Sequence, residues 1–216
     1  ERHGVYIVGY TDGTFGPSRS MTRSEAAAIF ARLLAEKNGD TISTAANTKF
    51  ADIPAHAWYS GYVKYLSNNG ITYGKSKTIF APNDAITRAE FTTMAVRFFD
   101  VYGDGDAETM EQFSGFNDVS SGYWAAEYIK YAALHGWING YGDGSFHAER
   151  EINRAEVVTI VNRLLGREAD EDYIADNLRK LNTFPDVSRK HWAYYAVMEA
   201  ANAHTAVLGE SESWSK

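Results

Sequence analysis

Apolar residues recur at helical spacing in three equivalent stretches of the chain. In each stretch they lie 3, 6, 7, 10 and 11 residues after an arginine, over 26–34, 91–99 and 157–165. This spacing gives one broad apolar stripe on a helix with about 3.6 residues per turn. Three such stripes in one chain bury most simply against each other, so the pattern predicts a central three-helix core.

Each stretch opens with a helix-capping sequence. The three copies are Met21-Thr22-Arg23-Ser24-Glu25, Ile86-Thr87-Arg88-Ala89-Glu90 and Ile152-Asn153-Arg154-Ala155-Glu156. A Thr or Asn at the N-cap with Glu three residues later is a capping box, and the apolar residue before it can pack on the fourth helical position. Three helices are therefore predicted to begin here, with their arginines 65 and 66 residues apart.

The position of the arginine in each first turn is unusual. A cation at a helix N-terminus opposes the helix dipole and gains nothing locally. The helix start itself offers N–H groups to an anion, and a guanidinium adds a bidentate partner for a carboxylate or phosphate. A single arginine here more often packs on an aromatic ring or pairs with a carboxylate. The threefold recurrence favours anion binding by Arg23, Arg88 and Arg154.

A glycine-bearing turn precedes each helix. Gly9, Gly74 and Gly140 lie fourteen residues before the arginines, and a phenylalanine lies eight before. The first and third turns contain Asp-Gly, which is typical of a tight turn. The middle turn has Lys75-Ser76-Lys77 instead, so its conformation and its specificity are expected to differ. The glycines either let backbone approach a ligand or adopt positive φ in the turn.

A third repeated motif is Phe-x-Asp followed by a tryptophan. The aspartates at 52, 118 and 186 are expected to be turn or cap residues. Trp58, Trp124 and Trp192 each open a short amphipathic helix. The sequence leaves open whether these tryptophans anchor the core or form the wall of a sugar site.

One repeat therefore comprises Phe-x-Asp, a Trp-helix, the glycine turn and an Arg-helix. Two repeats are complete, at 50–103 and 116–166. Residues 1–38 hold only a second half, and 184–204 hold an extra first half. Residues 184–204 are expected to close a pseudo-threefold ring by completing the half-repeat 1–38 of the same chain, or to complete that of a neighbouring chain by swapping. The remaining segments are connectors at 39–49, 104–115 and 167–183, and a polar, frayed tail at 205–216.

Composition excludes several classes of function. Among 216 residues there is no cysteine, which excludes disulfides, thiolate metal sites and a cysteine nucleophile. The net charge of −7 argues against a general nucleic-acid binder, so anion recognition is expected to be local. No apolar run has membrane-spanning length, and the first residues do not resemble a signal peptide, which could have been removed or lie upstream.

No metal site and no cofactor is expected. The six histidines form no metal-binding pattern at short spacing. The acidic run 104–108 lacks the glycine and glutamate of an EF-hand loop, so it is interpreted as a solvated linker.

Together these motifs resemble S-layer homology (SLH) modules of bacterial cell-surface proteins, over nearly everything up to residue 204. The resemblance implies an all-α fold, with three helix-loop-helix modules in pseudo-threefold arrangement around a central three-helix bundle. It implies non-covalent anchoring to the extracellular cell wall or S-layer through an acidic secondary cell-wall polysaccharide, often pyruvylated, held in grooves between modules. Departures from the family pattern are the start within a module, Asn153 in place of Thr, and the Lys75-Ser76-Lys77 turn.

By this resemblance the motif arginines bind the ligand carboxylate. Expected partners are the polysaccharide and possible self-association through the half-module termini, with no nucleic acid and no membrane insertion. Two alternatives are a helical-repeat scaffold for protein partners and a glycan-active enzyme. No catalytic residue is assigned, because capping boxes explain Glu25, Glu90 and Glu156. The candidate ligand-binding residues are Arg23, Arg88, Arg154, Gly9, Gly74, Gly140, Tyr10, Tyr141, Lys75, Trp58, Trp124 and Trp192.

Overall fold

The computed structural model describes residues 1–103, 113–207 and 212–215. Over these residues the chain is mostly helical, with seven α-helices and three short strands. The prediction of a helical protein is therefore confirmed, with a small sheet added. The acidic run at 104–108 lies outside the described residues. The chain divides into a middle unit, Ser20–Ile152, and a terminal unit made of Glu1–Arg19 and Asn153–Lys216.

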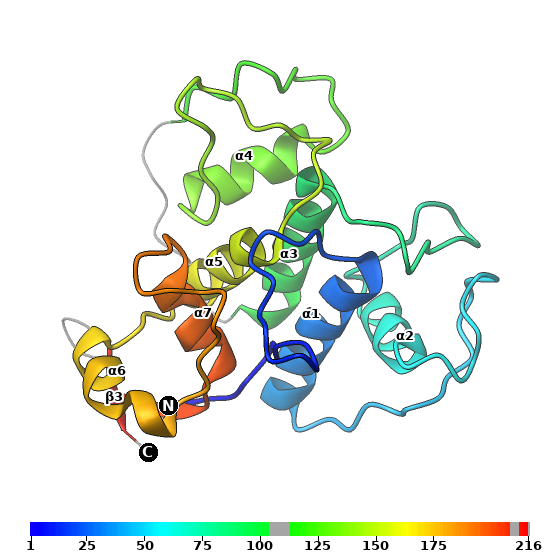
Figure 1. Ribbon diagram of the computed structural model, residues 1–216. Helices are drawn as coiled ribbons and strands as arrows, with labels where there is room; N and C mark the ends of the chain where they lie inside the picture. The colour runs from blue at the N-terminus through cyan, green and yellow to red at the C-terminus, as the bar shows by residue number, and fades with distance from the viewer. Residues whose placement is uncertain (104–112, 208–211, 216) are drawn as a thin grey trace. The chain divides into compact units, whose positions relative to one another are not determined.

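The middle unit contains four helices, shown in blue to green in Figure 1. They are α1 (Arg23–Asn38), α2 (Ser60–Asn68), α3 (Arg88–Tyr102) and α4 (Ala126–Leu134). Helix α1 packs against α2 and α3, and α3 packs against α4. The predicted apolar stripes of α1 and α3 meet, since the ring of Phe30 lies 5.3 Å from that of Phe91 and 4.9 Å from that of Phe98.

The terminal unit pairs α5 (Arg154–Leu165) with α7 (Tyr194–Ala201). Between them in sequence lie α6 (Glu171–Asn177) and the 3₁₀ helix η1 (Leu178–Lys180), within the segment interpreted as a connector. Each Arg-helix thus packs on the Trp-helix of the following repeat: α1 on α2, α3 on α4, and α5 on α7. Packing of α5 into a common three-helix core stays a prediction.

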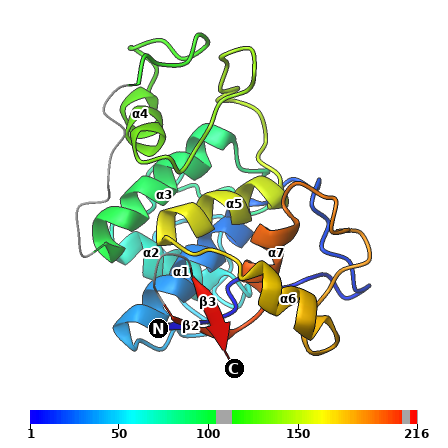
Figure 2. The ribbon, with the colours of Figure 1, turned by 90° about the vertical axis from the view of Figure 1, so that its left-hand side faces the viewer.

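The expectation that the polar tail at 205–216 is frayed is wrong for those of its residues that the structure describes. Strands β1 (Arg2–His3), β2 (His204–Val207) and β3 (Ser213–Ser215) form an antiparallel sheet in the order β1-β2-β3. Residues alternate between buried and exposed along β2 and β3, and the inward face carries Ala206 and Trp214. Strand β3 lies beside the start of α6, where the Trp214 amide donates to Asp170 at 2.9 Å (Figure 2). Burial of the indole and pairing with β2 order this segment.

The repeats meet in a closed ring of backbone hydrogen bonds just before the Arg-helices. The amide of Met21 donates to Ile152, that of Ile152 to Ile86, and that of Ile86 to Met21, at 2.9–3.0 Å. All three side chains are fully buried. All three predicted capping boxes are present, so α1, α3 and α5 each begin at the motif arginine. This ring relates the three repeats cyclically.

The repeat aspartates join the two halves of each repeat. Both carboxylate oxygens of Asp52 accept backbone N–H groups, from Phe80 at 2.9 Å and Ala81 at 2.7 Å. Asp118 and Asp186 make the equivalent pairs of hydrogen bonds. Of the two roles expected for these aspartates, the turn role is confirmed, because all three lie in turns, whereas none of them caps its own Trp-helix. The distant glycine turn supplies the amides instead.

The C-terminal half-repeat lies against the N-terminal half-repeat of the same chain. The amides of Phe15 and Gly16 donate to Asp186 at 2.9 and 2.7 Å, which reproduces the contact within each complete repeat. The Tyr6 amide also donates to Ala200 at 3.3 Å. Within the terminal unit, the two half-repeats therefore form the same pair of halves as a complete repeat.

Candidate functional site

The three motif arginines are buried, with only 4–5% of each residue exposed. The Nε of each donates to the carbonyl oxygen of the turn phenylalanine in the next repeat, taken cyclically. The pairs are Arg23 with Phe80 (2.7 Å), Arg88 with Phe146 (2.8 Å) and Arg154 with Phe15 (2.8 Å). Each guanidinium carbon also lies 4.5–5.0 Å from the centre of the same phenylalanine ring. Each arginine therefore clamps its repeat to the next one.

The start of α1 does not offer free amides to an anion. The amide of Arg23 donates to Asp84 at 2.9 Å, that of Ser24 to Pro82 at 3.0 Å, and that of Glu25 to its capping threonine at 3.2 Å. The equivalent amides of α3 and α5 are occupied in the same way. The expectation of an anion site built on free helix amides is wrong, because a loop of the adjacent repeat docks against each helix start.

The turn glycines are required by close packing on the Phe-x-Asp phenylalanines. A Cβ atom at Gly74 would lie 2.4 Å from the ring of Phe50, and one at Gly140 or Gly9 would lie 2.5 Å from the ring of Phe116 or Phe184. Gly74 also has a φ of 82°, in the left-handed region. These contacts give the glycines a structural role, and a ligand-binding role stays a proposal.

Four candidate residues line one cavity of about 370 Å³ in the middle unit: Arg23, Gly74, Lys75 and Trp124. Arg23 comes from α1, the Gly74-Lys75 turn follows α2, and Trp124 precedes α4. The cavity is thus built from three successive repeats. Glu90 and Arg97 of α3, and Glu149, add charge to its wall.

The charges in this cavity are already partly paired. The Oε1 atom of Glu90 lies 3.2 Å from Arg23 Nη1 and 3.9 Å from Lys75 Nζ. Lys75 Nζ also donates to Asp84 at 3.3 Å. Three basic and two acidic residues line the wall, so the cavity is net positive in a protein of net charge −7. A ligand carboxylate entering it would compete with Glu90.

Sequence reasoning missed Arg97. Its guanidinium lies 4.7 Å from the ring of Tyr73 and 5.0 Å from that of Tyr128, and it donates to the Tyr128 hydroxyl at 3.1 Å. A signal was present, because an arginine follows each motif arginine by nine residues. Its first copy, Arg32, stacks on Tyr62 in the same way, at 5.0 Å.

The three tryptophans are more exposed than buried. Trp58, Trp124 and Trp192 keep 54%, 56% and 65% of their surface accessible, and they precede α2, α4 and α7 respectively. This exposure argues against the core-anchor interpretation, and the role of the tryptophans as the wall of a sugar site stays a proposal. An indole face next to cations is suited to a sugar ring that carries a charged group.

The remaining candidates form two related groups. Arg88 lies 5.1 Å from the ring of Tyr141 and its Nη2 donates to Asn139 at 3.4 Å. Arg154 lies 4.7 Å from the ring of Tyr10 and its Nη2 donates to Val8 at 2.7 Å. In both groups a tyrosine takes the place that Lys75 has beside Arg23. The second turn therefore has a cation, Lys75, at the position where the first and third turns place an aromatic ring over the motif arginine.

The chain is built from three cyclically related repeats. Each repeat has a clamped arginine, a glycine turn and an exposed tryptophan, and this places the chain in a class of binding modules built from repeats. The S-layer homology domain matches residues 2–27, 49–92 and 115–158, which make up more than half of the chain. The chain therefore belongs to the S-layer homology domain family.

Curated relatives agree with this family. The chain is 33% identical over 218 residues to "Cell surface glycoprotein 1" of Acetivibrio thermocellus, covering 97% of this chain and 9% of that protein. It is 31% identical to the "Cellulosome-anchoring protein" of that organism, covering 97% of this chain and 44% of that protein. "Exoglucanase XynX", also from that organism, is 32% identical over 74% of this chain and 14% of its own length.

The chain thus spans less than half of each of these relatives. The match to the exoglucanase covers only 14% of that protein, so its name lends no support to catalysis by this chain. The family and the anchoring relatives identify the chain as an anchoring module at the bacterial cell-wall surface. No helix among the described residues has the length and apolar character needed to cross a membrane.

Proposed function

We propose that the cavity lined by Arg23, Lys75, Arg97 and Trp124 binds an acidic, pyruvylated sugar of the secondary cell-wall polysaccharide. Binding there anchors the parent protein to the wall. The observation that carries the proposal is the combination, in one cavity of about 370 Å³, of three cations with a tryptophan that is 56% exposed. The volume is within the range of small-molecule sites, which suits one or two sugar residues.

Each group has a distinct role in this proposal. The Trp124 indole packs against the apolar face of a sugar ring. Lys75 and Arg97 neutralise the ligand carboxylate, and Arg23 supplies a guanidinium edge that is held in place by Phe80. Charge-assisted hydrogen bonds of this kind contribute about 1.5–3 kcal/mol each. Affinity then comes from short contacts, as a protein of net charge −7 requires.

The experiment is isothermal titration with purified wall polysaccharide, before and after mild acid removal of ketal-linked pyruvate. Binding is expected before the treatment and a loss of at least tenfold in affinity after it. Equal binding of both polymers would contradict recognition of the pyruvyl carboxylate.

Two lysines of the same turn provide a matched pair of variants. Lys75 lines the cavity and Lys77 does not, although both are exposed and both substitutions remove one charge. Lys75→Gln is expected to weaken polymer binding several-fold more than Lys77→Gln. Trp124→Ala is expected to weaken binding to both the pyruvylated and the treated polymer. Equal effects of the two lysine variants on polymer binding would show that the ligand does not bind in this cavity.

A further inference from the structure

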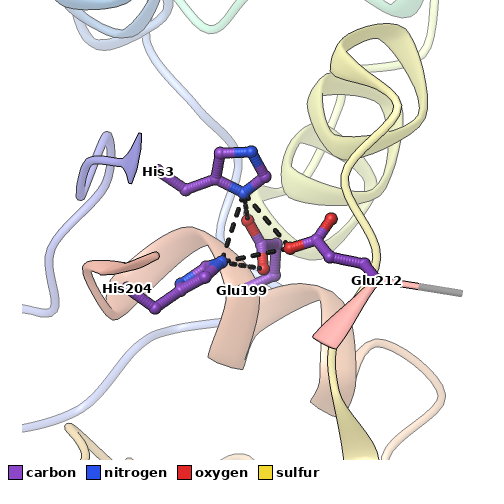
Figure 3. A group of neighbouring side chains, drawn as sticks. All are labelled: His3, Glu199, His204 and Glu212. Atoms are coloured by element: carbon purple, nitrogen blue, oxygen red, sulfur yellow. Dashed lines mark hydrogen bonds and ion pairs between the residues drawn. The ribbon is translucent and has the colours of Figure 1, made fainter. Parts of the chain in front are cut away.

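Four buried side chains of the terminal unit converge on one point (Figure 3). They are His3 on β1, Glu199 on α7, His204 on β2 and Glu212, immediately before β3. Their exposed fractions are 3%, 1%, 5% and 8%. No residue of this group belongs to the cavity assigned to the polysaccharide. His3 and His204 face each other as a cross-strand pair in the sheet.

The potential ligand atoms are spaced as the corners of a small polyhedron. His3 Nδ1 lies 3.2 Å from His204 Nε2, 3.2 Å from Glu212 Oε1 and 3.3 Å from Glu199 Oε1. His204 Nε2 lies 3.2 Å from Glu199 Oε2 and 3.2 Å from Glu212 Oε1. Ligands about 2.0–2.1 Å from a tetrahedral zinc ion lie about 3.3–3.4 Å from one another. These five separations of 3.2–3.3 Å are close to that edge length, and one ligand atom from each of the four residues lies within 4.8 Å of the other three.

Hydrogen bonding directs a lone pair of His204 into the group. Its Nδ1 lies 2.9 Å from the carbonyl oxygen of Asn202, which can only accept, so Nδ1 carries the proton. In the neutral imidazole Nε2 is then unprotonated and faces Nδ1 of His3. If both rings were protonated instead, two N–H groups would point at each other across 3.2 Å. The unprotonated Nε2 also faces carboxylate oxygens of Glu199 and Glu212 at 3.2 Å, and a cation among these three acceptors would satisfy them all.

Glu199 lacks the hydrogen bonds that a buried carboxylate needs. Neither of its side-chain oxygens has a hydrogen-bond partner, and its side chain is completely buried. A buried carboxylate without such bonds is strongly destabilising unless a cation neutralises it. Both oxygens point into the group, toward the nitrogens of His3 and His204 (Figure 3).

The other ligands are held in place by neighbouring groups. Glu212 Oε1 accepts from Trp214 Nε1 at 3.1 Å, and its Oε2 accepts from the Glu168 amide at 2.9 Å. The Trp214 ring stacks on His204, with ring centres 3.8 Å apart and planes 14° apart. Hydrogen bonds from surrounding residues are what orient ligands at metal sites in proteins.

We propose that His3, Glu199, His204 and Glu212 form a structural Zn²⁺ site. Two neutral imidazoles and two carboxylates neutralise one divalent ion, and four protein ligands in a buried setting are typical of a closed structural site. The ion ties together β1, β2, the start of β3, and α7. It therefore stabilises the closure of the N-terminal half-repeat by the C-terminal half-repeat.

The first test uses the 216-residue chain stripped with a chelator and then dialysed. Reconstitution with zinc is expected to give one bound ion per chain by plasma mass spectrometry and to raise Tm by several degrees. Substitution by Co²⁺ is expected to give the intense visible bands of tetrahedral cobalt. If the stripped protein takes up no zinc and its Tm does not respond to zinc, the proposal is wrong.

Variants assign the ion to this group. Glu199→Gln removes one charge while it keeps the shape of the side chain, and His204→Gln removes one nitrogen ligand. Both are expected to lower zinc affinity at least tenfold and to abolish the Tm rise, with folding checked by circular dichroism. His56→Gln, at an exposed histidine in the middle unit, is expected to bind zinc as the parent does. Should a folded Glu199→Gln variant also bind like the parent, the ligand assignment is overturned. If neither variant folds, the cobalt spectrum of the parent decides.

Discussion

Arg23 Nε donates to the carbonyl oxygen of Phe80 at 2.7 Å, and its guanidinium lies 5.0 Å from the ring of the same residue. Arg88 and Arg154 repeat this geometry with Phe146 and Phe15. Each motif arginine is therefore a joint between repeats, and Arg23 also forms part of the wall of a cavity. Loss of ligand binding in an arginine variant cannot by itself separate these two roles.

Arg23→Ala is expected to lower the free energy of unfolding by about 2–4 kcal/mol. It removes a buried, charge-assisted hydrogen bond and leaves the Phe80 carbonyl and Glu90 without that partner. Arg23→Lys is expected to be destabilised as well, because the planar fork over the ring is lost while the charge remains. Urea denaturation measures both variants. An Arg23→Ala variant as stable as the parent would contradict the role of Arg23 as a joint between repeats.

Asp118 is expected to make stability depend on acid pH. Burial raises the pKa of its carboxyl, but hydrogen bonds from the amides of Phe146 and His147 outweigh burial, so the folded pKa lies below its usual value. A folded pKa below the unfolded pKa gives stability that is fully present above the unfolded value. That stability is lost as pH falls through the folded pKa.

Asp118→Asn is therefore expected to cost about 1 kcal/mol at pH 7 and less as the pH falls below the pKa of the unfolded carboxyl. The measurement is the urea midpoint of parent and variant between pH 7 and pH 2. Asp176→Asn, on the exposed surface of α6, is the matched control for charge. A constant difference between Asp118→Asn and the parent at all pH values would rule out this linkage.

Local signals predicted the helix starts well. Each capping box needs only residues within three positions of each other, and all three are present at Thr22, Thr87 and Asn153. The expectation of free helix amides was wrong because their acceptors, such as Asp84 and Pro82 for α1, come from another repeat. Local sequence determines that a helix begins, but not which distant loop packs on its first turn.

Clusters of residues that are distant in sequence could not be predicted from the sequence for the same reason. His3 and Glu212 share one cluster although almost the whole chain separates them, so a search for metal ligands at short spacing misses them. Trp214 becomes a buried strand residue through stacking on His204 and pairing with β2, which no local pattern indicates. Arg97, by contrast, could have been found from the sequence, because an arginine follows each motif arginine by nine residues.

Truncation before Phe184 is expected to destabilise the N-terminal half-repeat. The shortened chain loses Asp186, which binds the Phe15 and Gly16 amides, together with α7 and strands β2 and β3. The apolar face of 1–19 then loses its partner. Thermal unfolding is expected to shift down by several degrees, with increased self-association in light scattering. An unchanged Tm would show that 184–215 does not complete the first repeat.

The Glu90 side chain has two separable roles. Its Oε2 accepts from the Thr87 amide at 3.1 Å in the capping box, and its Oε1 contacts Arg23 and Lys75 in the cavity. Gln serves in capping boxes as Glu does, so Glu90→Gln keeps the helix start. The same change removes the negative charge that competes with a ligand carboxylate for both cations.

Glu90→Gln is therefore expected to bind the acidic wall polysaccharide about threefold to fivefold more tightly, since its pair with the partly exposed Lys75 is worth up to about 1 kcal/mol. The Tm is expected to fall somewhat, because the buried Arg23 guanidinium loses its carboxylate partner. The gain in affinity should shrink at high salt because the added attraction is electrostatic. Asp172→Asn on α6 makes the same change in net charge at an exposed residue that does not line the cavity, and it is expected to leave affinity unaltered. Titration calorimetry at low and high salt compares the two variants with the parent. If Glu90→Gln binds the polymer more weakly than the parent while it remains folded, Glu90 itself contacts the ligand and the cations of this cavity are not the carboxylate's partners.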